Sequence, residues 1–476
     1  IHEGQRVYVN QVLVSGLQYT RPFVVDRQIV THHGDPLSQA DLLRTQSRLY
    51  DLGIFNGVDV AVQNPEGEET YKDVLVNVTE ARRYTFDYGL GFEVQTGSAF
   101  STAAPQGRTG ASPRVAFDVN RLNFRGRNDT IFFKSHFGRL QQRALVGYEV
   151  PHWLDHESLK LTFNQLYDNT RDVFTFTSRR LEGSAQVQQT WSKATTLLYR
   201  LTYRDVRVAN LVIDPNQVPL LSRPVRVGIP SLTYIRDTRN DPVDSHKGNY
   251  LVFDTGVASH VLGSQANFAR FLVQHSEYHP FGYKGRFVLA HSTRLGIEQP
   301  WGTGAIIPLP ERFFAGGGNS LRGFAINQAG PRDPVTGYQL GGEAMFVNNV
   351  ELRLPPVLLP FIGKDLSPVI FHDMGNVFAS TSDLFPSLFR WSQPDKTECE
   401  NLSLTVTCNL NYTSHAVGGG IRYRTPIGPV RFDVGYNLNP PAFRIGGQSL
   451  PTGGTAPLNL QMLHKVNFFF SIGQTF

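Results

Sequence analysis

The amino-acid sequence predicts a transmembrane antiparallel β-barrel of about 16 strands, preceded by one small α+β domain with the element order β-α-α-β-β. The mean hydropathy of the 476 residues is -0.24, and no apolar run approaches the ~20 residues that a membrane-spanning helix needs. Aromatic residues nevertheless make up 12% of the chain, and there are 44 glycines. From about residue 83 onward apolar and polar residues alternate, as in strands that turn one face toward lipid.

Residues 1–82 have the pattern of a separate domain. A strand is predicted near residues 7–14 and a weak helix over 20–31. A clearer helix begins after Ser38, a favourable N-cap residue, and ends at Gly53. Apolar residues share one face of this helix and two alternating strands follow it, namely Leu42, Leu49 and Leu52 on the helix and residues 55–62 and 71–78 in the strands.

The first predicted barrel strand shows the alternation clearly. Over residues 84–94, aromatic or aliphatic side chains occupy the even positions, and polar residues or glycine occupy the odd ones. Eleven residues suit a tilted transmembrane strand. The pattern recurs in residues 159–167, 197–204 and 430–438. Charges on the inward face are costly in a dry core, so a soluble β-sandwich is the less favoured alternative.

Connections between the predicted strands alternate between short and long. Short periplasmic turns, such as residues 124–129, and long outer loops, such as residues 379–413, are typical of bacterial barrels. An even number of strands returns the C-terminus to the periplasmic side, where the N-terminal domain is also expected. The connection from about residue 300 to 341 is long enough to be functional or disordered.

A Gly-rich segment within this long connection ends in Leu-Arg-Gly-Phe. It resembles the motif of the BamA/TamA superfamily of outer-membrane β-barrel assembly proteins, which lies on a loop that folds back into the barrel. Residues 418–429 resemble the family's penultimate hairpin and residues 468–476 its last strand. Residues 1–82 resemble a POTRA domain, most clearly at 49–55. The loop motif consists of Leu321, Arg322, Gly323 and Phe324.

The resemblance implies that Arg322 points into the barrel, where an unpaired buried charge would be costly. In the family the carboxylate partners come from the following strands, and the matching segments here supply Glu351 and Asp373. A guanidinium can bind a carboxylate through two parallel hydrogen bonds, which would hold the loop in one position. The alternative is an Arg322 exposed to solvent in a mobile loop.

The resemblance further implies a protein that inserts and folds β-barrel proteins through a lateral gate between its first and last strands. A client strand could add to such an edge by β-augmentation. Interior glycines weaken strand pairing, and the predicted seam contains Gly89, Gly91 and Gly473 and ends at Phe476. The alternative is that these glycines allow close packing in the lumen.

Two other classes of function remain open. A two-partner-type secretion pore shares the soluble domain and the loop motif, although it usually has a second soluble domain and a plug helix. A passive porin would need neither the N-terminal domain nor the arginine loop. No G-x-S-x-G, P-loop or H-E-x-x-H motif occurs, so we expect neither an enzyme nor a cofactor.

Two smaller features carry predictions. Cys399 and Cys408 are the 2 cysteines of the chain, and their close spacing in a polar stretch predicts a disulfide in an external loop, hence an oxidising compartment. Two free thiols are the alternative. His275, Glu277 and His279 share one face of a strand and could bind a metal, but a polar strand end near an interface is favoured and no metal is expected.

The resemblance also implies location and partners: the bacterial outer membrane, with the N-terminal domain in the periplasm. Expected partners are unfolded outer-membrane β-barrel clients, the lipid bilayer, and periplasmic or lipoprotein accessory subunits. A nearly balanced charge, +5 overall, argues against nucleic acid. The chain begins at Ile1 without a signal peptide, so we expect a processed or cut N-terminus and further domains upstream. The motifs fit BamA-like and TamA-like roles, with a slight preference for BamA.

Overall fold

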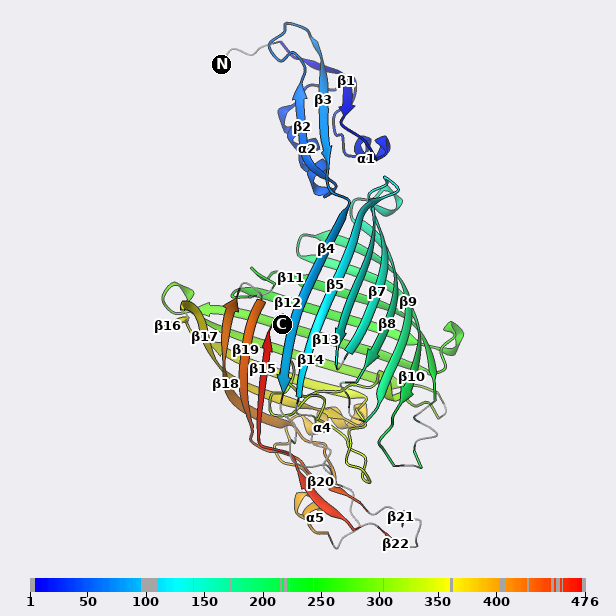
Figure 1. Ribbon diagram of the computed structural model, residues 1–476, viewed down its shortest axis with the longest axis vertical. Coiled ribbons are helices and arrows are strands. Elements are labelled where there is room, and N and C mark those ends of the chain that lie inside the picture. Colours follow the sequence, from blue (N-terminus) through cyan, green and yellow to red (C-terminus); the bar gives the residue numbers. More distant parts are fainter. Residues whose placement is uncertain are drawn as a thin grey trace. The chain divides into compact units, whose positions relative to one another are not determined.

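Figure 1 shows the computed structural model of the chain, which forms two compact units. The first comprises Ile1–Asp87, Phe117–Lys134 and Leu145–Phe163, and the remainder of the chain forms the second.

The predicted seam residues Gly473 and Phe476 lie outside the described part of the chain. The structure describes residues 5–472 except 96–109, 140, 172, 174, 215, 218–220, 222, 243, 303, 360–362, 403–407, 426–427, 447–448, 451–453 and 456.

The N-terminal domain has the predicted order β-α-α-β-β. Its three-stranded sheet has the order β1-β3-β2, in which β1 runs parallel and β2 antiparallel to β3. The weak helix predicted over residues 20–31 is shorter, because Val30 N–H donates to Thr45 Oγ1 of the second helix at 3.1 Å instead of continuing the first. The elements are β1 (Tyr8–Ser15), α1 (Pro22–Asp26), α2 (Gln39–Asp51), β2 (Phe55–Val62) and β3 (Tyr71–Glu80).

Helix α2 covers the sheet with the face that its sequence predicts. Leu42 and Leu49 are buried in the domain core, and Leu52 packs against that core. Ser38 occupies the N-cap position, but its side chain makes no capping hydrogen bond. Gly53, just past the helix, has φ +68°, the left-handed conformation in which glycine carries no steric penalty.

The barrel is closed and antiparallel within the described residues (Figure 1). Strands follow one another in chain order from β4 to β19, and β24 completes the ring between β19 and β4. Because β16 (Val357–Leu359) continues β15 (Ala344–Arg353) along the same partner, the two count as one and the barrel has the predicted 16 strands. The others are β4 (Tyr84–Gln95), β5 (Gly110–Phe124), β6 (Asp129–Gly138), β7 (Gln141–Pro151), β8 (Leu159–Thr170), β9 (Thr177–Ser192), β10 (Thr195–Ala209), β11 (Val225–Asp237), β12 (Gly248–Ala258), β13 (Phe268–Phe281), β14 (Phe287–Pro300), β17 (Gly363–Phe378), β18 (Ser414–Thr425), β19 (Gly428–Asn437) and β24 (Val466–Ile472).

Side chains alternate between the lumen and the outer face of the barrel. On β19, Arg431 and Asp433 are buried inside, whereas Phe432 and Val434 are exposed on the outside. This is the arrangement of a barrel with lipid outside and a polar interior. No helix among the described residues is long and apolar enough to cross a membrane.

Short elements lie in the connections between barrel strands. The connection between β17 and β18 contains two helices, and that between β19 and β24 contains two small hairpins. These elements are α4 (Thr381–Ser387), α5 (Lys396–Glu400), β20 (Ala442–Ile445) with β23 (Asn459–Met462), β21 (Ser449–Leu450) with β22 (Gly454–Thr455), and the 3-10 turns η1 (Trp153–Asp155), η2 (His260–Leu262), η3 (Tyr283–Gly285) and η4 (Leu309–Glu311).

Hydrogen bonds within the first unit join the N-terminal domain to the turn between β5 and β6. Arg21 N–H donates to the Gly126 carbonyl at 2.9 Å, and Asn123 Nδ2 donates to Thr20 Oγ1 at 2.7 Å. Gly126 has φ +70°, and a Cβ there would lie 2.3 Å from the Tyr19 carbonyl oxygen. The turn therefore requires glycine at this position, because a side chain would separate it from the domain.

Candidate functional site

The connection between β14 and β15 folds into the barrel and forms part of its core. It is held by short bridges between Phe313 and Gly342 and between Ala315 and Ala329. Its apolar side chains are buried among residues of β15, β17 and the connection before β24. That cluster contains Phe313, Ala315, Leu321, Phe324 and Ala329 of the loop with Met345, Val347, Val377, Phe443 and Leu463 around it.

Arg322 lies at the centre of this loop and is 3% exposed. Its Nε and Nη2 donate to the two oxygens of Asp373 at 2.8 and 2.7 Å, and its backbone N–H also donates to Asp373, at 3.0 Å. Nη1 donates to Glu351 at 2.9 Å. The guanidinium carbon is 3.4 Å from the ring centroid of Phe371. The structure therefore places Arg322 between the two carboxylates named from the sequence, with an aromatic face beneath it.

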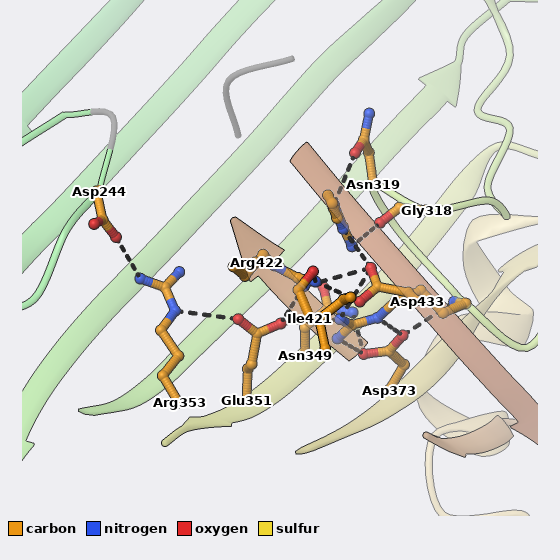
Figure 2. Close-up of polar contacts among 12 residues, drawn as sticks. Asp244, Gly318, Asn319, Asn349, Glu351, Arg353, Asp373, Ile421, Arg422 and Asp433 are labelled. Carbon is orange, nitrogen blue, oxygen red and sulfur yellow. Dashed lines mark hydrogen bonds and ion pairs between the residues drawn. The ribbon is translucent and has the colours of Figure 1, made fainter. Parts of the chain in front are cut away.

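The ion-pair network extends beyond those three residues (Figure 2). Asp433 of β19, with no exposed surface, accepts from Arg422 Nη1 at 2.6 Å and from Arg431 Nε. Arg422 Nη2 also donates to Glu351 at 3.1 Å, which connects Asp433 to the loop site. Arg353 Nε donates to the second Glu351 oxygen at 3.1 Å. Four arginines and three carboxylates thus compensate one another's charges, which ions buried away from water require.

Sequence reasoning did not identify Asp433, Arg422 and Arg431 as partners of the loop. The signal was present in the alternation: Arg431 and Asp433 occupy inward positions of β19, and Arg422 pairs with Arg431 in the β18–β19 register. What the sequence could not supply was the distance between this hairpin and the loop, because about 100 residues separate them and only the closure of the barrel brings them together.

Glycines allow the loop to lie directly against the last strands. The Gly323 carbonyl accepts hydrogen bonds from Asn437 Nδ2 at 3.1 Å and from Asn467 Nδ2 at 2.9 Å. A Cβ on Gly323 would lie 2.7 Å from the Ala416 Cβ, and one on Gly435 would lie 2.2 Å from the Arg322 carbonyl oxygen. Gly323 is therefore required because the loop backbone lies too close to the barrel strands for a side chain. The loop is hydrogen-bonded to both β19 and β24.

A polar cavity of about 640 Å³ adjoins the network. Its lining includes Arg239, Arg294 and Arg353 with Glu351. Arg294 donates to the backbone carbonyl of Asn319 in the loop. The cavity is thus a charged, water-compatible part of the lumen rather than an apolar ligand pocket.

The seam between the first and last strands is short in the described residues. β24 pairs with β4 through four residue pairs, from Phe469 with Gln95 to Ile472 with Phe92. The β19–β24 ladder has seven pairs and the β18–β19 ladder has ten. Gly89 lies in β4, and a Cβ there would make only an ordinary 3.6 Å contact with Ala116. Tight packing therefore does not account for Gly89.

Two further features considered in the sequence are the disulfide and the possible metal site on β13. Cys399 and Cys408 form a disulfide with an S–S distance of 2.00 Å in the connection between β17 and β18, so the predicted bond is confirmed. His279 and His291 both lie within 3.4 Å of Glu277. Across the described ranges, however, no group of three or more His, Cys, Asp or Glu side chains is arranged to hold a metal ion.

Comparisons with known proteins agree with this geometry. Residues 123–476 match the Omp85 superfamily domain, and residues 7–81 match the POTRA family described as a surface antigen variable number repeat. The chain is 26% identical over 481 residues to "Outer membrane protein assembly factor BamA" of Nitratidesulfovibrio vulgaris, covering 100% of this chain and 52% of that protein. It is 25% identical over 384 residues to "Sorting and assembly machinery component 50 homolog B" of Xenopus laevis, covering 76% and 73%.

A solved structure has the same fold. BamA from Haemophilus ducreyi lacking POTRA domains 1–3 superposes with a TM-score of 0.75 at 18% identity, covering 99% of this chain and 85% of that one. The chain spans about half the length of the BamA relatives it matches. Since the superfamily match covers most of the sequence and the barrel, internal loop and N-terminal domain are all present, the chain belongs to the Omp85 superfamily.

Proposed function

We propose that this protein inserts and folds β-barrel proteins in the bacterial outer membrane, with its N-terminal domain in the periplasm. Two relatives are named outer membrane protein assembly factors, which supports a BamA-like role. Its clients would be unfolded β-barrel chains, assisted by periplasmic or lipoprotein subunits. Assembly of this kind requires the exchange of hydrogen-bonded strands and no making or breaking of covalent bonds. No catalytic residue or cofactor is therefore part of the proposal.

The observation that carries the proposal is the short seam between β4 and β24, which has four residue pairs within the part of the chain that the structure describes. Each broken pair releases main-chain donors and acceptors, and such an edge can accept an incoming strand by β-augmentation. Among the described residues, this seam has fewer pairs than the β19–β24 ladder, with seven, and the β18–β19 ladder, with ten, so it costs less to open. We infer that opening occurs here and that clients enter sideways into the bilayer.

The internal loop supports lateral insertion over the alternative of a two-partner-type secretion pore. The loop is packed in the lumen through Leu321 and Phe324 and is held there by Arg322. A polypeptide passing through the lumen would have to displace this buried network. A client entering at the seam would leave it in place.

A disulfide staple across the seam tests the proposal. Glu93→Cys with Ser471→Cys occupies one register pair of the seam, and Ile421→Cys with Phe432→Cys occupies a pair in the β18–β19 ladder as the matched control. Both go into a Cys399→Ser, Cys408→Ser background. Oxidation should abolish client insertion by the seam variant, reductant should restore it, and the control should work throughout. Full activity with the seam closed would contradict lateral insertion and favour the secretion pore.

A further inference from the structure

The first part of the internal loop contacts a different wall of the barrel from the part that carries Arg322. Ile307 is fully buried in an apolar cluster with residues of β11, β12 and β13. Glu311, at the end of η4, is also buried and accepts a hydrogen bond from Nη2 of Arg204 on β10. The loop is therefore held on this wall by a buried ion pair, which we call the β10 anchor, as well as by apolar packing.

The β10 anchor continues into a line of charges along the barrel wall. Arg204 Nη1 is 3.8 Å from Glu182 of β9, which is 3.9 Å from Arg180 Nε. Arg180 Nη2 donates to Asp168 of β8 at 3.0 Å. Each of these side chains has an oppositely charged neighbour, as buried ions require. Glu311 of the loop is thus joined to a network fixed on three barrel strands.

The ionic contacts of the loop lie on opposite sides of the ring. With β15 and β16 counted as one strand, seven strands separate β10 from β19 in either direction, β11 to β18 on one side and β24 to β9 on the other. Arg431 of β19 donates to the Gly318 carbonyl and to Asn319 Oδ1 of the loop, and the β10 anchor holds Glu311. The loop therefore extends across the lumen and is fixed at both sides.

Other contacts of the loop lie in the connections next to β9 and β10. The rings of Phe314 and Phe176 have centroids 5.9 Å apart, and Phe176 belongs to the connection before β9. Thr336 Oγ1 donates to the Val212 carbonyl, in the connection after β10, at 3.2 Å. A polypeptide moving along the lumen would have to displace the loop from this side or from β19.

We propose that Glu311 and Arg204 are positioning residues that hold the internal loop across the lumen, so that the lumen stays closed while the seam opens. Without Glu311, Arg204 would keep only the more distant Glu182 as a partner, and the first part of the loop would lose its charged contact with β10. Neither anchor residue lies on β4 or β24, so separation of those strands leaves the anchor intact. The link to seam opening rests on the proposed function.

Single-channel recording of the full chain in planar bilayers, without clients, tests the β10 anchor. Glu311→Gln keeps the size of the side chain and removes its charge. The fraction of time in which the lumen conducts should rise by at least about tenfold, because loss of one partner from a buried ion pair is strongly unfavourable. Asp205→Asn removes a paired carboxylate from the same strand as Arg204 and, as the matched control, should conduct like the wild type. Unchanged conduction by Glu311→Gln would overturn the proposal.

A covalent link at the same place separates positioning from a general loss of stability. Glu311→Cys with Arg204→Cys should conduct as Glu311→Gln does, and a flexible bismaleimide that joins the two thiols should return conduction to the wild-type level. Both native cysteines are in the disulfide and do not react. Arg204→Cys alone, treated in the same way, should stay conductive. A protein that carries the cross-link, verified by mass, and still conducts would contradict a positioning role.

Client insertion by the cross-linked protein shows whether the loop has to leave β10 during assembly. We expect insertion at the wild-type rate, because a fixed loop leaves the seam free to open. Loss of insertion in a cross-linked protein with a closed lumen would overturn the proposal. It would not contradict lateral insertion, which the seam staple tests separately. If the wild type inserts no clients, the proposed function fails, and the conductance measurements still decide the role of the β10 anchor.

Discussion

The guanidinium of Arg322 meets the carboxylate of Asp373 edge to edge, with two nitrogens donating to two different oxygens at 2.8 and 2.7 Å. The pair joins the internal loop to β17, and neither side chain has appreciable exposed surface. Since the same arginine also reaches Glu351, one residue fixes the loop to two strands of the barrel. The hydrogen bonds of Arg322 to Asp373 and Glu351 therefore hold the loop against both strands.

Arg322→Ala should lower the free energy of unfolding by about 3–5 kcal/mol, because Asp373 is left as a buried charge without its main partner. Arg322→Lys should recover only part of the loss, since an ammonium cannot form both parallel bonds. Urea unfolding of the barrel in detergent measures both effects. Arg207→Ala, in an exposed pair with Asp205, is the control and should change little. Equal stability of the Arg322→Ala and Arg207→Ala proteins would show that the buried pair does not hold the loop.

Gly435→Ala should displace the loop from β19. The new Cβ would lie 2.2 Å from the Arg322 carbonyl oxygen, and overpacking of this kind costs about 1–3 kcal/mol. We expect faster protease cleavage within residues 313–324 and a higher single-channel conductance. Gly419→Ala, whose Cβ would be 3.4 Å from its nearest neighbour, should leave both unchanged. A Gly435→Ala protein with wild-type cleavage would mean that the loop tolerates this displacement.

Replacing Cys399 and Cys408 by Ser should loosen only the connection between β17 and β18. Closing so short a ring contributes roughly 2–3 kcal/mol to local order in the chain-entropy description. Arg444 donates from Nε to the Cys399 carbonyl at 2.6 Å, which keeps α5 beside β20 in part. Limited proteolysis should accelerate within residues 379–413, while the unfolding midpoint of the barrel stays constant. A large drop in that midpoint would contradict a local role.

Low pH should release the segment that joins the N-terminal domain to the first turn. Burial raises the pKa of the Glu80 carboxyl, but backbone N–H groups of Thr20, Tyr19 and Gln18 donate to it at 2.7, 2.9 and 3.1 Å, and the net pKa is lowered. A lowered folded-state pKa means that this stabilisation is present above the unfolded value of 4.5 and is lost as the pH falls through the folded one.

Hydrogen exchange of the amides of residues 18–20 measures this release. Protection should fall as the pH drops below 4.5, after correction for intrinsic exchange. Glu80→Gln should show the reduced protection already at neutral pH, whereas Asp59→Asn, an exposed carboxylate of β2, should behave as the wild type. Protection that does not depend on pH in the wild type would refute a role for the charged form of Glu80.

The sequence by itself determined the barrel and the small domain. Alternation over residues 84–94 and 430–438 identifies barrel strands because lipid and lumen impose opposite polarity on successive side chains. The spacing of Leu42 and Leu49 identifies the buried face of α2, because residues seven positions apart lie on the same side of an α-helix. The Leu-Arg-Gly-Phe motif pointed to an internal loop through its resemblance to the BamA/TamA superfamily, and Arg322 and Gly323 supply the charge and the close backbone approach of the site.

Tertiary structure alone decided which distant residues meet. The weak helix predicted over residues 20–31 was shortened by the bond from Val30 to Thr45, a contact that local sequence cannot encode. Asp433 joined the Arg322 network, and the seam has four pairs among the residues that the structure describes, because barrel closure sets the register of strands far apart in the chain. Alternation assigns each side chain to a face, but position around and along the barrel depends on pairings with other strands, and these arise only when the whole ring has formed.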